Sequence, residues 1–370
     1  MKYSKVSMIV SREIGKSIAE ELVAFGIRHH FNEIGRSSIL DRNKSFSSFF
    51  SKPALISYPV DILSFFLQED EDRAVLGYFA KKYDLRSPGK GSIFSQDVEI
   101  LNVHEDYKPK QELSFKHNGD ESSLFSNLTG IVCVVQRGEG DKVARISLNY
   151  GTSVPATTYG EGSGVRDKLG LLRITLPAEK ELINLVLSRH DADAVMELYI
   201  SEAKLDEPGR GIAYSFPIKH GIINTKISRS QTDSAASVEQ MVSAIDSLKG
   251  GMEWRKSSLE RESFKRREFL YDLVGLNLIC EEGHGTGLVE AAMSSGAPGA
   301  TICKIRYTNL DGEMEIHRSM KELCKMIVPE SQVPDICEAL EKTGCFENEA
   351  KALLYSLPVQ KAFTYRAKRY

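Results

Sequence analysis

One pattern of strand, glycine and helix occurs three times along this chain of 370 residues, and this repetition restricts the fold more than any other feature. Three stretches align without a gap: VSMIVSREIGKSIAEELVAFG (6–26), IVCVVQRGEGDKVARISLNYG (131–151) and LNLICEEGHGTGLVEAAMSSG (276–296). Each reads as a short apolar strand, a turn, a helix of about ten residues and a closing glycine. The sequence therefore predicts three copies of one structural unit.

Two glycines recur in every copy and have different expected uses. The first is expected to open the turn before the helix, at Gly15, Gly140 and Gly285. The second is expected to end the helix in the left-handed conformation, at Gly26, Gly151 and Gly296.

The second half of the unit also repeats. A strand follows each closing glycine (29–40, 153–159 and 300–307), and a loop of variable length comes after it. Then a strand leads to a helix with an apolar stripe, over 71–83, 191–203 and 331–343, and a last strand closes the unit. The order strand, helix, strand, strand, helix, strand is the split ferredoxin-like topology, with both helices on one face of an antiparallel sheet.

The other face of such a sheet has no cover. Leaving it to water would expose a larger apolar patch than soluble proteins tolerate, so we expect the three uncovered faces to turn toward one axis and bury each other. The predicted fold class is α+β, with three ferredoxin-like (βαββαβ) repeats forming an intramolecular pseudo-trimer. A chain that covers its own sheet faces is expected to be a monomer, or at most a dimer.

The expected boundaries divide the chain into three segments and one connector. Segment 1 is residues 1–112, segment 2 is 121–227 and segment 3 is 268–370. The connector, 228–267, holds an amphipathic helical stretch and then a charged run of mixed sign, which we expect to be solvated rather than a nucleic-acid patch.

Composition points to an ordinary soluble protein. The chain has 48 Lys and Arg against 51 Asp and Glu, a net charge of −3, so no overall field draws it to nucleic acid or anionic lipid. No apolar stretch reaches the roughly 20 residues of a membrane span, and the first residues read as a strand rather than a signal peptide. The six cysteines include no C-x-x-C pair and are expected to be buried thiols. We expect a cytoplasmic protein with no membrane insertion and no metal site.

The three copies resemble the P-II family of nitrogen regulatory signal-transduction proteins and its P-II-like relatives. The stretches that carry the resemblance most clearly are GEGDKVARISLNYG (138–151), EEGHGTGLVEAAMSSGAPGATI (281–302) and the glycine turn before the last strand. The resemblance implies ATP or ADP as an effector between neighbouring units, and a regulated enzyme or transporter as the protein partner. No obligatory cofactor is expected.

The turn before the last strand resembles the phosphate-binding B-loop of that family. It is Gly89, Lys90 and Gly91 in segment 1, and Gly209, Arg210 and Gly211 in segment 2. Glycine amides beside a fixed cation form a concavity suited to phosphate. In both turns the cation stands between the glycines, whereas the family usually places it after the second one. Segment 3 has Ala350 and Ala352 instead of glycines, so binding is expected at segments 1 and 2.

The loop after the second strand of segment 2 resembles the T-loop through which the family binds the regulated protein. Its expected ligand-binding residues are Gly160, Gly162, Gly164, Arg166 and Lys168. The glycines leave the backbone free to move, and the two cations suit an anion or a partner. We expect this loop, 160–179, to be mobile in the free protein.

These observations favour a P-II-like sensor that binds an adenine nucleotide or small anion between repeats and signals to a protein partner through the T-loop. One alternative is an interaction scaffold of the same fold whose ligand sites have degenerated. A second is an enzyme or metal-handling protein of the same topology. It is not favoured, because no nucleophile, base and orienting group stand at usable spacing. We therefore expect a protein that is not an enzyme, with no catalytic residue.

Overall fold

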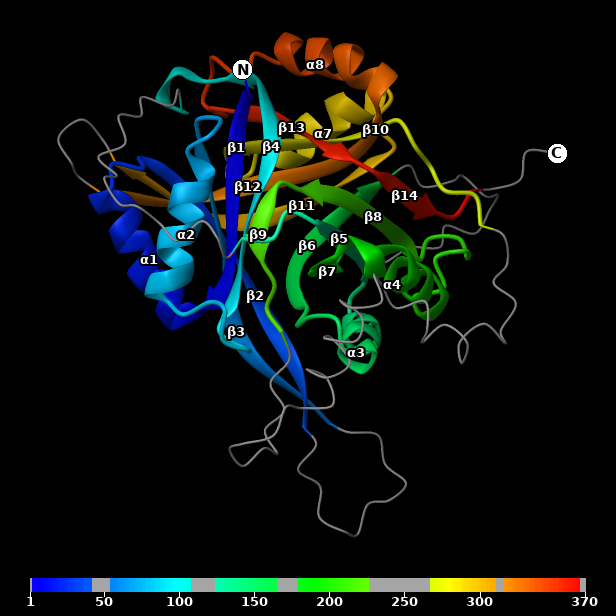
Figure 1. The fold of residues 1–370 in the computed structure, drawn as a ribbon. Coiled ribbons are helices and arrows are strands. Elements are labelled where there is room, and N and C mark those ends of the chain that lie inside the picture. The colour runs from blue at the N-terminus through cyan, green and yellow to red at the C-terminus, as the bar shows by residue number, and fades with distance from the viewer. Residues whose placement is uncertain are drawn as a thin grey trace.

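The computed structural model describes residues 2–41, 54–107, 124–164, 179–225, 267–310 and 316–366. The connector 228–267, apart from its last residue, lies outside these ranges, as does 165–178 of the predicted T-loop. Figure 1 shows strands of all three segments gathered at the centre of the molecule, with the helices around them.

Each segment contains the same order of main elements. Segment 1 forms β1 (Lys2–Ser11), α1 (Arg12–Ala24), β2 (His29–Asp41), β3 (Ala54–Leu67), α2 (Asp72–Lys82), β4 (Gly91–Val103) and the short helix η1 (Glu105–Tyr107). Segment 2 forms β5 (Leu128–Gln136), α3 (Gly140–Tyr150), β6 (Ala156–Gly164), β7 (Glu179–Ser188), α4 (Arg189–Glu202), β8 (Gly211–Ile218) and β9 (His220–Ile222). Segment 3 forms β10 (Leu273–Glu281), α7 (Gly285–Ser294), β11 (Gly299–Leu310), β12 (Ile316–Pro329), η3 (Glu330–Gln332), α8 (Val333–Lys342), β13 (Leu353–Val359) and β14 (Lys361–Thr364).

The first helix of each segment ends where the repeated glycine predicts. Gly26, Gly151 and Gly296 have φ of 81°, 77° and 113°, in the left-handed region that residues with a side chain rarely adopt. The expected use of the closing glycines is therefore confirmed.

The strands of all three segments form a single antiparallel sheet. Within the segments the strand orders are β2-β3-β1-β4, β6-β7-β5-β8 and β11-β12-β10-β13. The outer strands then pair across segment boundaries, because β2 pairs with β6 and with β11, and β6 also pairs with β11. Within the described residues, nine strands close into a barrel through these pairings, and five further strands extend it.

The end of each segment also joins the last main strand of another segment. The end of β4 pairs with the start of β13, β9 pairs with the start of β4, and β14 pairs with the start of β8. The three segments are thus linked in a cycle. These pairings satisfy backbone groups that would otherwise be exposed along the sheet edges.

Two kinds of apolar core follow from this arrangement. Outside the sheet, each segment packs its own helices against one face, as Ile18 of α1 and Val75 of α2 pack against Met8 in segment 1. Inside, residues of all three segments share one core, in which Val132 of segment 2 and Cys303 of segment 3 take part. The inner faces of the sheet therefore bury one another.

The predicted fold class, three small ferredoxin-like repeats forming a pseudo-trimer, is wrong. The chain instead forms one strand-dominated, closed antiparallel barrel, because pairing does not stop at the segment boundaries. Apolar patterns in a sequence reveal the faces of a sheet but not its edges, which also need partners. Strands β2, β6 and β11 supply those partners to one another, so no segment keeps a separate sheet. The segment boundaries themselves stay a prediction.

We predict that Gly160→Ala destabilises the barrel more than Gly162→Ala does. A Cβ at Gly160 would lie 2.9 Å from the carbonyl oxygen of Ile302 in β11, whereas a Cβ at Gly162 would meet the flexible side chain of Lys180. Urea unfolding should show a loss of about 1–3 kcal/mol for Gly160→Ala and under about 1 kcal/mol for Gly162→Ala. Equal losses would contradict the close approach of β6 to β11.

Candidate functional site

Each segment places one carboxylate at the same point of its sheet. These carboxylates are Asp61 of β3, Glu181 of β7 and Glu322 of β12. They lie opposite three residues that align with one another in the first strand of each segment: Val10, Val135 and Cys280. Asp61 and Glu181 are buried, with 3% and 4% of their surface exposed. All three lie beside the start of a helix, where backbone amides lack partners within the helix.

These carboxylates explain the first repeated glycine. Glu181 Oε2 accepts hydrogen bonds from the amides of Gly138 (2.9 Å) and Gly140 (2.8 Å), and Glu322 Oε2 accepts one from Gly285 (2.7 Å). A Cβ at Gly140 would lie 2.7 Å from Glu181 Oε2, so a side chain there would displace the carboxylate. The expectation that this glycine opens a turn is wrong, because Gly140 and Gly285 are the first residues of α3 and α7. Glycine is needed there so that the helix start can approach an acid.

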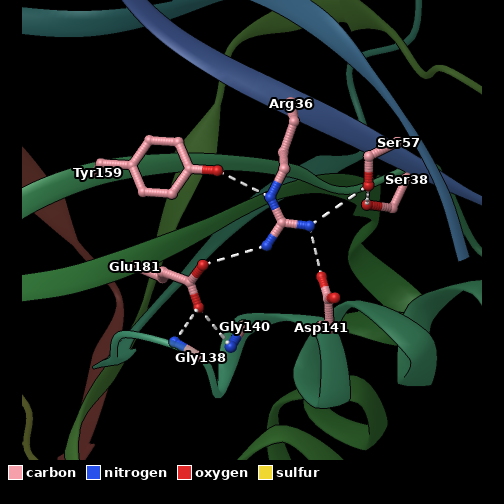
Figure 2. A network of polar contacts seen from close by, with 8 residues as sticks. All are labelled: Arg36, Ser38, Ser57, Gly138, Gly140, Asp141, Tyr159 and Glu181. Atoms are coloured by element: carbon pink, nitrogen blue, oxygen red, sulfur yellow. Dashed lines mark hydrogen bonds and ion pairs between the residues drawn. The ribbon is translucent and has the colours of Figure 1, made fainter.

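At the contact of segments 1 and 2, an arginine from β2 completes this arrangement, as Figure 2 shows. Arg36 Nη2 donates to Glu181 Oε1 at 3.1 Å, and Nη1 donates to Asp141 Oδ1 in the first turn of α3 at 2.5 Å. Arg36 Nε donates to Tyr159 Oη at 2.8 Å, and Nη1 also donates to Ser57 Oγ at 3.3 Å. One cation therefore joins β2, β3, β6, β7 and α3.

Arg36 is largely buried and stays charged. Only 22% of its side chain is exposed, against 6% for Glu181. Burial alone would lower the pKa of Arg36, but its hydrogen bonds to Asp141 and Tyr159 outweigh that effect and raise the pKa above its ordinary value. Because two carboxylates surround one guanidinium, the network leaves no net positive charge for an incoming anion.

An arginine at the same strand position occurs at the contact of segments 3 and 1, where its pairing with the acid is weaker. Arg306 of β11 occupies the position that Arg36 has in β2, and it approaches Asp61. Burial raises the pKa of Asp61, while the charges of Arg12 and Arg306 oppose the rise. Arg12 Nε lies 3.6 Å from Asp61 Oδ1, which gives attraction without a good hydrogen bond.

A second polar cluster joins segments 3 and 1. Lys321 of β12 bonds to Glu281 and to Tyr107 Oη, and its ammonium lies 4.8 Å and 4.9 Å from the ring centres of Tyr107 and Tyr307. His29 packs against both tyrosine rings, and burial lowers its pKa to about 4. A cation enclosed by a carboxylate and two aromatic rings is held in place. We therefore interpret this cluster as a structural contact between segments 3 and 1.

In segment 1 the predicted phosphate turn is already bonded to segment 2. Gly89 has a φ of 80°, and its amide donates to the carbonyl of Thr225 and to Asn224 Oδ1, both at 3.1 Å. Gly91 begins β4, where a Cβ would lie 2.6 Å from a carbonyl oxygen of β1. Lys90 between them is exposed. The glycines therefore serve close backbone packing at this turn.

In segment 2 the predicted turn is bonded to its surroundings through its carbonyl groups. Gln136 Nε2 donates to the carbonyl of Gly209 at 3.2 Å. The hydroxyl of Thr364, at the end of β14, donates to the carbonyl of Gly211 at 2.8 Å. Arg210 pairs with Glu207 at 2.9 Å, which partly neutralises its charge.

The turn of segment 3 has alanines where the other two turns have glycines, and its positive φ lies at the middle residue instead of the outer two. Lys351 has a φ of 41° and pairs with Asp106 at 2.7 Å. The carbonyl of Ala352 accepts a hydrogen bond from the amide of His104 at 2.9 Å. Each of the three turns thus receives the tail of another segment.

The structure places the predicted binding residues on separate elements. The turns at 89–91 and 209–211 belong to different segments, and they lie at the starts of β4 and β8. The predicted T-loop glycines, 160–164, lie in β6, which β7 and β5 separate from β8.

The first part of the predicted T-loop is strand. Gly160 lies opposite Lys180 of β7, and Gly162 and Gly164 lie opposite residues of β11. The expectation of a mobile loop that begins at Gly160 is therefore wrong for 160–164. Arg166 and Lys168 lie outside the described residues.

Arg36 and the three helix-start acids are not predicted by the patterns above. The sequence does hold a signal for the acids. The third strands of the three segments contain the aligned stretches VDILSFF, KELINLVL and KELCKMIV, and the second residue of each is an acid. Arg36 has no comparable signal, since its charged partners, Asp141 and Glu181, come from another segment.

Within the described ranges, no three His, Cys, Asp or Glu side chains form a group that could hold a metal ion. Among those same residues, the helices are too short or too polar to cross a membrane. Comparison with protein-family models, with curated proteins and with solved structures finds no match to this chain. Any inference about function therefore depends on the geometry of the contacts between segments.

We predict that Arg36→Met lowers the free energy of unfolding by about 1–3 kcal/mol, because it leaves Glu181 buried without its cation. Methionine keeps much of the apolar stem, so lost packing contributes little. Urea unfolding measures the loss. The double variant Arg36→Met, Glu181→Gln should lose less than the sum of the two single variants.

An exposed ion pair provides the control. The side chains of Arg137 and Glu179 are 64% and 60% exposed. Arg137→Met removes this pair and should lower the free energy of unfolding by under about 1 kcal/mol. A loss from Arg36→Met no larger than that from Arg137→Met would contradict a structural role for Arg36.

We predict that acid weakens the contact of segments 3 and 1 through two histidines. Burial lowers the pKa of His29 and of His30 from 6.5 to about 4, and nearby positive charges add to the effect. The folded state therefore resists protonation, so their contribution to stability is present above pH 6.5 and is lost as the pH falls toward 4. The unfolding free energy should fall by up to about 1.4 kcal/mol per pH unit for each histidine.

Urea unfolding at several pH values tests this slope. His30→Leu should make it shallower across the acid range, because one titrating group is gone. His190→Leu, at an exposed position on α4, is the control and should leave the slope unchanged. An acid slope unaffected by His30→Leu would assign the pH dependence to other groups.

Proposed function

We propose that this chain is a non-catalytic interaction scaffold, a barrel that binds a protein partner and whose P-II-like ligand positions are filled by its own groups. One observation carries the proposal: each turn expected to hold a phosphate receives the tail of another segment. In segment 1 the Gly89 amide is already bonded twice. An incoming phosphate would have to displace these bonds and leave their acceptors unpaired.

The helix starts support the same function. Anion sites in proteins commonly use free amides at a helix N-terminus. In segments 2 and 3 those amides donate to Glu181 and Glu322, so the chain supplies its own anion. Arg36, which bonds to Glu181, is neutralised by a second carboxylate from Asp141. These contacts suit a permanent junction better than the exchange of a ligand.

The partner surface that we propose is the free end of the β2–β3 hairpin. From Ser38 opposite Ser57 to Asp41 opposite Ala54, the two strands pair with each other, and no other strand of the described chain joins them. Figure 1 shows this end extending away from the helices and the rest of the sheet. Ile56 at the free end is 38% exposed. An exposed apolar group on a defined hairpin can contact another protein, and the P-II resemblance suggests a regulated enzyme or transporter.

A P-II-like sensor of ATP or ADP is the second candidate, and one observation favours it. Gly209 and Gly211 keep positive φ values of 73° and 140°, beside Gln136 at the end of β5. A turn of this shape could present amides to a phosphate after the β14 tail moved away.

A thermal-shift screen with ATP, ADP, AMP, cyclic AMP and 2-oxoglutarate separates the two functions. We predict no saturable rise of the melting temperature with any of them, because the Gly89 amide is already bonded in segment 1 and Arg210 is already paired with Glu207 in segment 2. A sensor at a hundred times its dissociation constant would gain about 2.7 kcal/mol of stability. If ATP or ADP gives such a gain and Arg210→Met removes it, the sensor is supported and the scaffold proposal fails.

The second arm of this test concerns the partner surface. Replacing 39–56 by an Asn-Gly pair joins Ser38 to Ser57 through a two-residue turn and keeps every pairing with the barrel. Replacing 310–316 in the same way gives a matched control on the β11–β12 hairpin. The protein captured by cross-linking in native extract should be lost from the first variant and kept by the second. Equal capture by both would exclude the β2–β3 hairpin as the partner surface.

A further inference from the structure

A cavity of about 70 Å³ lies inside the barrel, bordered by side chains of all three segments. Its polar lining includes Lys5, Glu33, Gln96, Tyr214, Asn277 and Lys325. A buried water needs about 10–15 Å³ on the same measure, so the cavity has room for several waters or for one small ion.

The groups that line this cavity carry one more positive charge than negative. Lys325 Nζ lies 2.6 Å from Glu33 Oε2, and these two charges balance each other. Glu33 is the single carboxylate among the residues that line the cavity. Among the residues that the structure describes, Lys5 therefore has no carboxylate of its own, and the contact that its ammonium makes is with the ring of Phe31, at 5.9 Å.

A positive charge set among apolar and neutral side chains is costly without a partner, so this excess calls for a counter-charge. Burial lowers the pKa of Lys5 to about 8, while Glu33 raises it and Lys325 lowers it further. Lys5 thus remains largely protonated at pH 7. The tyrosines at the cavity supply no charge, because burial raises the pKa of Tyr214 to about 12 and also raises that of Tyr355.

Neutral donors complete the lining. Gln96 and Asn277 are 3% and 6% exposed, and their carboxamides border the cavity. Each carboxamide can donate an N–H, and the Tyr214 hydroxyl can donate as well. Such donors around an ammonium can replace part of the water shell of an anion.

We propose that this cavity binds one small monovalent anion, a halide or a compact oxyanion such as nitrate, bicarbonate or formate, with Lys5 as its principal partner. A nucleotide is far too large for this volume. An excess of one positive charge matches a monovalent ion better than sulfate or phosphate. No residue of the three turns lines the cavity, and the proposal does not depend on the scaffold function.

A bound anion would connect the three segments. Lys5 and Gln96 come from segment 1, Tyr214 from segment 2, and Asn277 and Lys325 from segment 3. Because these groups converge only in the folded barrel, the anion should bind the folded state alone and stabilise the whole molecule.

Melting temperatures in sodium chloride, bromide, nitrate, bicarbonate and formate test the site, with ionic strength held constant by gluconate, which is too large for the cavity. We expect a saturable rise with at least one of these anions. Lys5→Met should raise the dissociation constant of that anion by at least about tenfold, because it removes the facing charge. Glu33→Gln should lower it, because the excess positive charge increases.

Two further measurements keep the proposal falsifiable. Lys342→Met, at a position 71% exposed on α8, is the matched control and should leave the response unchanged. Anomalous diffraction from crystals grown in bromide should place an ion within hydrogen-bond reach of Lys5 Nζ, even if Lys5→Met fails to fold. If no anion produces a saturable rise, or if Lys5→Met responds as the wild type does, the cavity holds water and the proposal is wrong.

Discussion

The edge-to-edge pairing of β2, β6 and β11 is the interaction on which the rest of this structure depends. These strands come from three segments, and their hydrogen bonds turn three four-stranded arrays into one closed sheet. Closure satisfies backbone groups that an open edge would leave exposed. It also brings the inner sheet faces together, so the apolar residues of one segment are covered by those of the other two.

The same pairing decides where the charged groups meet. Glu181 and Glu322 accept hydrogen bonds from amides within their own segments, whereas Arg36, the cation that bonds to Glu181, comes from a neighbouring segment. Arg36 lies opposite Thr157 of β6, and this places its guanidinium beside Glu181 on the next strand. A buried ion pair recovers only part of its desolvation cost, so such a contact orients the segments more than it stabilises them.

The three copies have diverged at the barrel centre in a way that packing explains. The positions aligned with Lys5 are Gly130 and Gly275. Phe216 occupies the space where a side chain at Gly130 would lie, and Leu357 packs close to Gly275. Three lysines at this level would repel one another in a small space. One lysine and two glycines leave a single excess charge and the cavity beside it.

The sequence by itself determined the local structure: the order of strands and helices in each segment, the apolar stripes and the left-handed helix ends at Gly26, Gly151 and Gly296. These features depend on residues close together in the chain. Only the tertiary structure decided that the segments share one barrel, that Arg36 meets Glu181, that the Gly89 amide is occupied and that Lys5 faces a cavity. Each of these depends on which strand edges meet across segments. Strand edges pair through backbone hydrogen bonds. Every residue type has a backbone carbonyl and all but proline have a backbone N–H, so these bonds leave no side-chain pattern in the sequence that predicts them.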